Sequence, residues 1–111
     1  MPRISTHVLD IAKGAPAAGI VIELHHGSRG INSSITNKDG RTDEPLITAG
    51  RIPAGPYELV FRVQDYLRKH HAAAHPFFDN ITIRFHVTDE TANYHIPLLL
   101  APHAYSTYRG S

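Results

Sequence analysis

The sequence predicts an all-β fold of the sandwich class, and two observations support this prediction. Turn-forming residues recur about every dozen positions, a spacing typical of short strands joined by tight turns. The runs between these turns alternate apolar and polar residues, as strands do when one face packs on a core and the other meets water. The turn residues are Lys13-Gly14, Gly27-Ser28, Asp39-Gly40, Gly50, Gly55-Pro56 and Pro102.

The first half of the chain contains one strongly patterned strand and three weaker ones. Residues 20–24 carry Ile20, Ile22 and Leu24 on one face, which predicts a half-buried strand. Weaker alternation predicts strands over residues 5–10 and 31–37 and a short piece around Arg41, which follows the Asp39-Gly40 turn.

The second half begins with another strong strand and then leaves the β pattern. Residues 57–63 place apolar side chains at every odd position, and residues 81–87 repeat this arrangement. Between them, residues 66–74 lack a period of two and contain three alanines, so we interpret them as a short helix or a helical loop. Pro76 ends this segment because proline lacks a backbone N–H and clashes with a preceding helical turn.

The last two predicted strands cover residues 94–100 and 103–108. The chain therefore holds roughly eight strands, which we expect to form two sheets packed face to face with one short helix. Its 111 residues fit a single domain, residues 1–111.

The outward faces of two strands are not plain solvated surfaces. Each combines a histidine with apolar residues, and contiguous exposed apolar positions usually mark an interface. We therefore expect a homo-oligomer, with two-fold symmetry the commonest operator. These outward faces consist of Ser5, His7 and Leu9 in the first strand and of His95, Pro97 and Leu99 in the later one.

The composition excludes several classes of function. A net charge of +1 provides no basic surface for nucleic acid or an anionic membrane. The absence of cysteine rules out disulfides, thiolate metal sites and a cysteine nucleophile. No run reaches the roughly 18 apolar residues that cross a bilayer, and the first residues show no secretory signal, so we expect a cytoplasmic protein.

Three stretches, in order and at matching spacing, resemble the transthyretin-like family on its 5-hydroxyisourate hydrolase branch. The closing Tyr108-Arg109-Gly110-Ser111 is the most specific part, because transthyretin, the hormone carrier of the family, lacks it. Transthyretin also has other residue types at the positions of His7, Arg41 and His95. The three stretches are Ser5–Asp10 with Gly14, Pro16 and Ala17; Thr36–Arg41; and Tyr94–Leu100 running to Tyr105–Ser111.

The resemblance implies a prealbumin-like β-sandwich of two four-stranded sheets with one short helix. It implies a homotetramer, a dimer of dimers, with active sites in the channel between dimers. The implied reaction opens the ring of 5-hydroxyisourate to 2-oxo-4-hydroxy-4-carboxy-5-ureidoimidazoline in urate degradation, with no metal or organic cofactor.

The resemblance also implies the site residues. His7, Arg41 and His95 would be catalytic, and a neutral imidazole is a suitable base for activating water near neutral pH. A guanidinium beside it would keep the imidazole neutral and stabilise negative charge on the carbonyl oxygen. We take His7 as the general base paired with Arg41, and His95 as the group that orients water or shares the proton. Substrate would be bound by His7, Arg41, Tyr108, Arg109 and Ser111.

Two other functions remain open at this level. A carrier of the same fold would bind a small aromatic ligand without catalysis. A histidine-rich metal-binding protein is the weaker alternative, since seven further histidines lie outside the motif. Most of these we expect to be solvated surface residues; they are His25, His26, His70, His71, His75, His86 and His103.

Overall fold

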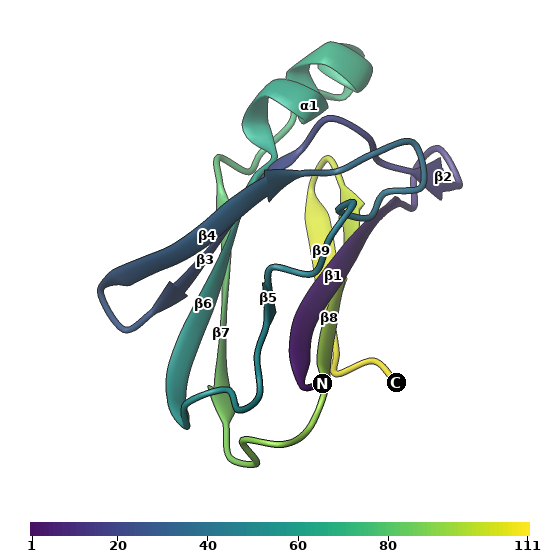
Figure 1. Cartoon of the computed structure of the whole chain (residues 1–111). Coiled ribbons are helices and arrows are strands. Elements are labelled where there is room, and N and C mark those ends of the chain that lie inside the picture. Colours follow the sequence, from purple (N-terminus) through teal and green to yellow (C-terminus); the bar gives the residue numbers. More distant parts are fainter.

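The computed structural model describes residues 1–111 as two β-sheets facing each other, with a helix at one end (Figure 1). One sheet has the strand order β4-β3-β6-β7 and is antiparallel throughout. These strands are β3 (Val21–His26), β4 (Arg29–Ile35), β6 (Gly55–Arg62) and β7 (Ile81–Val87). The predicted sandwich is therefore confirmed.

The other sheet has the order β2-β1-β8-β9, and a fifth strand, β5, also pairs with β1. β2 and β5 are two residues each and pair with opposite ends of β1, so the sheet is four strands wide at the β2 end, where β9 also pairs with β8. Its strands are β1 (Arg3–Asp10), β2 (Ala15–Pro16), β5 (Ile47–Thr48), β8 (Tyr94–Ala101) and β9 (Ala104–Thr107). The strand expected around Arg41 is only a single bridge between Arg41 and His7.

The predicted helix exists but is shorter and starts earlier. α1 (Gln64–His70) is followed by a single 3₁₀ turn, η1 (Ala72–Ala74), and the two lie at the end of the sandwich away from both termini (Figure 1). No helix in the structure has the length and apolar character that spanning a membrane requires.

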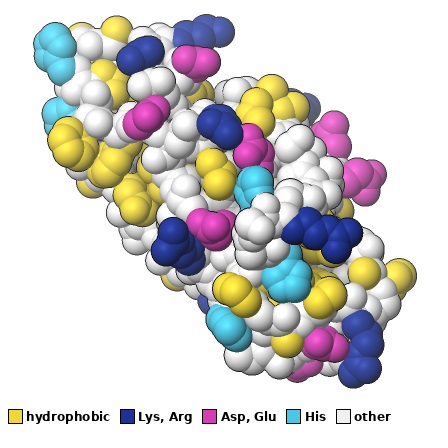
Figure 2. Space-filling view, turned by 90° about the vertical axis from the view of Figure 1, so that its left-hand side faces the viewer, with side chains coloured by type: hydrophobic (Ala, Val, Ile, Leu, Met, Phe, Trp, Pro, Cys, Tyr) yellow, Lys and Arg dark blue, Asp and Glu magenta, His cyan; other side chains and the backbone are white.

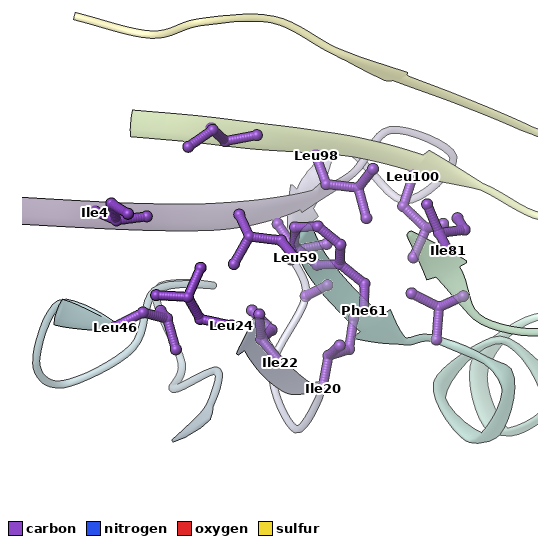
Figure 3. Packing of buried hydrophobic residues seen from close by; sticks show 14 of the residues in the cluster. Ile4, Ile20, Ile22, Leu24, Leu46, Leu59, Phe61, Ile81, Leu98 and Leu100 are labelled. Carbon is purple, nitrogen blue, oxygen red and sulfur yellow. The ribbon is translucent and has the colours of Figure 1, made fainter. Parts of the chain in front are cut away.

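The core lies between the sheets and follows the predicted alternation. Twenty buried hydrophobic residues form one cluster. Figure 3 shows side chains of β1 and β8, such as Leu98, pointing toward those of β3 and β6, such as Leu59. In β1 the even positions are buried, so Ser5, His7 and Leu9 face outward as expected. Thr6, one of two buried polar residues of this strand, donates its hydroxyl to the Ile96 carbonyl.

β1 and β8 run parallel, the one parallel pairing among these strands. Ser5 lies opposite His95, and His7 lies opposite Pro97. Side chains at alternate positions of neighbouring strands share a face, so this register brings the outward residues of both strands together. The pairing links residues about 90 positions apart and decides the composition of the outer surface.

A buried carboxylate ties α1 to the first sheet. Asp10 is 1% exposed and accepts hydrogen bonds from the Tyr66 hydroxyl and His71 Nε2, both at 2.7 Å, and from the Lys13 amide at 3.0 Å. Burial raises the pKa of Asp10, but these hydrogen bonds outweigh it and hold the pKa below its ordinary value. His71 is therefore a structural partner, and our expectation that it is a solvated surface residue was wrong.

We expect Asp10→Asn to destabilise the fold by about 3 kcal/mol, because it removes the charged partner of a buried hydrogen-bonded pair. A lowered native pKa means that this stabilisation is present above the ordinary aspartate pKa and is lost as pH falls through the native value. Urea unfolding at neutral pH and near pH 3 measures both effects. Asp79→Asn is the matched control, since Asp79 is exposed and makes no hydrogen bond. Equal stability of the two variants at neutral pH would contradict the prediction.

Candidate active site

The two predicted histidines form a hydrogen-bonded pair on the outer face of the first sheet. His7 Nδ1 lies 2.8 Å from His95 Nε2, and the ring centroids are 4.9 Å apart with an interplanar angle of 31°. Both side chains are half-buried. Each projects outward because its strand buries the neighbouring positions, and the parallel register supplies the contact.

A third polar group continues this pair. Ser5 Oγ lies 2.8 Å from His95 Nδ1, so both ring nitrogens of His95 have hydrogen-bond partners. His7 uses only Nδ1. The one ring nitrogen of the pair without a partner in the chain is therefore His7 Nε2, which is free to meet water or a ligand.

Arg41 reaches this pair from a tight turn. Asn37 Oδ1 accepts the amides of Asp39 and Arg41, and the Gly40 carbonyl accepts the Val8 amide at 2.8 Å. Gly40 has φ +73°, and a Cβ there would lie 2.4 Å from the Val8 carbonyl oxygen. Only glycine allows this close approach. The turn then places the Arg41 backbone in an isolated β-bridge with the His7 backbone.

We expect Gly40→Ala to cost at least about 2 kcal/mol of stability, because it combines a left-handed φ with a clash against backbone that cannot move freely. Thermal and urea unfolding measure the loss. Gly50→Ala is the control: Gly50 is exposed, has no left-handed φ, and a Cβ added there would have no atom within 4 Å. The prediction would be contradicted if Gly40→Ala changed the free energy of unfolding by no more than the roughly ±0.5 kcal/mol that is usual for a surface substitution.

The C-terminal segment closes one side of the pair. The Gly110 amide donates to the His95 carbonyl at 2.6 Å, and a Cβ at Gly110 would lie 2.8 Å from His95 Cδ2. This segment therefore packs directly against the His95 ring. Tyr108 and Ser111 line the same depression, and both are exposed.

Arg109 lies elsewhere. Its guanidinium donates to the Asn93 carbonyl at 3.2 Å and stacks 4.4 Å above the Tyr94 ring. It lines a second, more apolar depression between β7 and the β8–β9 hairpin. The structure thus brings together five of the six predicted site residues, His7, Arg41, His95, Tyr108 and Ser111, and separates Arg109 from them.

Five residues that sequence reasoning missed also line this depression. Arg3 and Ser5 belong to the outward row of β1 and Pro97 to that of β8, while Asn93 directly precedes β8, two positions before His95. The alternation that indicated the histidines therefore also indicated these residues. Apart from its place in the Tyr108-Arg109-Gly110-Ser111 motif, nothing in the sequence indicated that Gly110 lines the site. The depression is lined by Arg3, Ser5, His7, Arg41, Asn93, His95, Pro97, Tyr108, Gly110 and Ser111.

Burial and nearby positive charge both favour the neutral form of the two imidazoles. Burial and the Arg41 guanidinium lower the pKa of His7 below its ordinary 6.5. Burial, then His7, Arg41 and Arg3, lower the pKa of His95 in the same direction. Two neutral imidazoles beside two guanidiniums form a site that can take a proton from water and attract negative charge.

The remaining histidines do not join this site. His26 stacks on Tyr57 at 4.1 Å, His25 donates to Glu23 at 3.1 Å, and His103 donates to the His75 carbonyl at 2.8 Å. Figure 2 shows histidines spread along the length of one face, with charges of both signs between them. No group of three or more histidine, cysteine, aspartate or glutamate side chains lies close enough to hold a metal ion.

Comparison with known proteins gives one consistent result. The model of the HIUase/Transthyretin family matches residues 4–110. A 5-hydroxyisourate hydrolase of Deinococcus radiodurans is 48% identical over 115 aligned positions, covering 99% of this chain and 97% of the relative.

Two solved structures show how far the likeness extends within the fold. A 5-hydroxyisourate hydrolase of Klebsiella pneumoniae has a TM-score of 0.84 and 34% identity, with each chain fully covered. Sea bream transthyretin, solved with thyroxine, has a TM-score of 0.86 at 25% identity, covering 97% of this chain and 94% of the other. The two backbones are about equally close to this chain, so the fold alone does not separate a 5-hydroxyisourate hydrolase from a transthyretin.

Proposed function

The chain belongs to the HIUase/Transthyretin family, and we propose that it hydrolyses 5-hydroxyisourate in urate degradation at the depression around His7, Arg41 and His95. The observation that carries this proposal is the hydrogen-bonded histidine pair with one free ring nitrogen beside a guanidinium. A site of this composition suits water-driven opening of a cyclic amide.

His7 is the general base. Its free Nε2 takes a proton from water, and the water oxygen attacks the ring carbonyl carbon. The C–N bond then breaks, and the proton on His7 passes to the leaving nitrogen. The water thus ends as a hydroxyl on carbon and a hydrogen on nitrogen, and the base returns to its starting state.

Arg41 acts on both charge changes of this cycle. Its guanidinium helps to keep His7 neutral before the attack. The same positive charge stabilises the oxyanion that develops on the carbonyl oxygen, a type of stabilisation that is often the largest single contribution to catalysis. Arg3, at the rim of the same depression, adds to the positive potential.

His95 supports the base through the 2.8 Å contact with His7 Nδ1. When His7 gains a proton at Nε2, the proton on Nδ1 can shift toward His95, so the pair shares the positive charge. Tyr108 and Ser111 bind the substrate from the C-terminal segment. For Arg109 to bind substrate, the side chain would have to leave the Tyr94 ring.

The active form in this proposal is a homotetramer, a dimer of dimers with the sites at the dimer–dimer interface. The outward row that carries His7 and His95 also carries the half-buried Leu9 and Leu99, and Tyr108 is 55% exposed. An open depression with such a rim gains walls when a second copy covers it. Light scattering at working concentration tests this, and a monomer would contradict it.

The carrier function is the alternative, and one experiment separates it from catalysis. Urate and urate oxidase generate 5-hydroxyisourate, and its absorbance decay is followed with and without this protein. We expect decay faster than the spontaneous rate and proportional to protein concentration. Decay at the spontaneous rate, with the protein folded, would overturn the enzyme function.

A further inference from the structure

Ser5 contacts the histidine pair at His95. It lies in the outward row of β1, two positions before His7, and the parallel register sets it opposite His95. Its Oγ is 2.8 Å from His95 Nδ1 and has no other hydrogen-bond partner. Ser5, His95 and His7 therefore form a chain of three groups joined by two hydrogen bonds.

The protons in this chain have two possible arrangements. Each neutral imidazole carries one N–H. If His95 is protonated at Nδ1, it donates to Ser5 and accepts from His7 Nδ1, and His7 Nε2 is bare. If His95 is protonated at Nε2, it donates to His7 Nδ1, and His7 must carry its proton at Nε2. The tautomer of His95 thus decides whether His7 can act as a base.

We propose that Ser5 is a positioning residue that accepts a hydrogen bond from His95 Nδ1–H and thereby keeps His7 Nε2 free of a proton. This inference rests on the proposed function of His7. Within the chain, the Ser5 hydroxyl is the hydrogen-bond partner of His95 Nδ1. Without it, a half-buried N–H at Nδ1 would lack a partner, which costs free energy. Arg41 lines the same depression as His7, and its positive charge there favours a lone pair over an N–H at the unpartnered nitrogen of His7.

The test compares Ser5→Ala with Ser5→Thr, which retains a hydroxyl. Ser33→Ala is the matched control, since Ser33 is an exposed strand serine whose hydroxyl makes no hydrogen bond. Nitrogen-15 NMR of the substrate-free protein reports the tautomer of His95. We expect Nδ1–H in the native chain and in Ser5→Thr, and Nε2–H in Ser5→Ala.

Kinetics provides the second readout. We expect Ser5→Ala to lower kcat by about 10–100-fold, the range typical of groups that orient a working histidine, with KM nearly unchanged. Ser5→Thr should restore kcat, and Ser33→Ala should leave it unaltered.

Two results would overturn the role of Ser5: an Nε2–H tautomer of His95 in the native chain, or an unchanged kcat in Ser5→Ala. The NMR measurement needs no substrate, so it decides the direction of the hydrogen bonds independently of turnover. Absence of hydrolysis by the native chain would instead overturn the proposed function.

Discussion

Replacing His7 with alanine is expected to lower kcat for 5-hydroxyisourate hydrolysis by about 10²–10⁴-fold, the usual contribution of a general base. The reason is geometric, because His7 Nε2 is the one ring nitrogen of the pair without a partner. The fold should survive, since His7 lies on the outer face of β1 and contributes nothing to the core. Initial rates from the coupled urate oxidase assay, with circular dichroism as the folding check, measure the effect.

Two further variants sharpen this prediction. His86→Ala is the control, because His86 is an exposed strand histidine outside the depression and makes no hydrogen bond. His95→Ala should lose less activity than His7→Ala, since His7 retains its free nitrogen. In the double variant the losses should be far from additive, because the two rings act as a unit. Full activity of folded His7→Ala, or a larger loss for His95→Ala, would remove His7 from the role of base.

Arg41→Gln is expected to lower kcat/KM by about 10²–10³-fold, as loss of an oxyanion-stabilising group does. It should also move the acid limb of the pH profile. His7 must be neutral to work, and burial and Arg41 together hold its pKa below 6.5, so the native limb lies below 6.5. Removing the cation raises the His7 pKa, so the limb should shift upward while burial still keeps it below 6.5.

Arg41→Lys separates charge from shape. Lysine retains the positive charge, so the acid limb should stay near the native position even though kcat/KM falls with the loss of the planar guanidinium. Profiles of kcat/KM against pH report the free enzyme and measure this directly. If the acid limb of the Arg41→Gln profile stays in place or moves to lower pH, Arg41 does not lower the pKa of His7.

Most of the fold, and the outward placement of His7 and His95, were predictable because they depend on local pattern. Period-two alternation showed which face of residues 5–10 and 94–100 points outward, and the structure confirms both faces. The Asp39-Gly40 turn before Arg41 was predictable for the same reason, because the hydrogen bonds that form it join residues only a few positions apart. The outward row also contained Arg3 and Ser5, which the same alternation indicated and which we did not predict as site residues.

Residues whose partners are distant in sequence were not predictable. His71 was expected to be solvated, yet it donates to Asp10, 61 positions away. Arg109 was grouped with the site from the closing motif, and it instead lies over the Tyr94 ring. Side-chain direction at such positions depends on which segments pack together, and no local period encodes that.

The sequence by itself determined the sandwich and the outward faces, and its resemblance to the family supplied the residues that we propose carry the chemistry. The tertiary structure alone decided that His7 and His95 share a hydrogen bond, that Ser5 occupies the other nitrogen of His95, and that one ring nitrogen remains free. Alternation along a strand is a property of each backbone separately. The register between two parallel strands about 90 residues apart is determined by burial of the whole core, and that register decides which outward side chains touch.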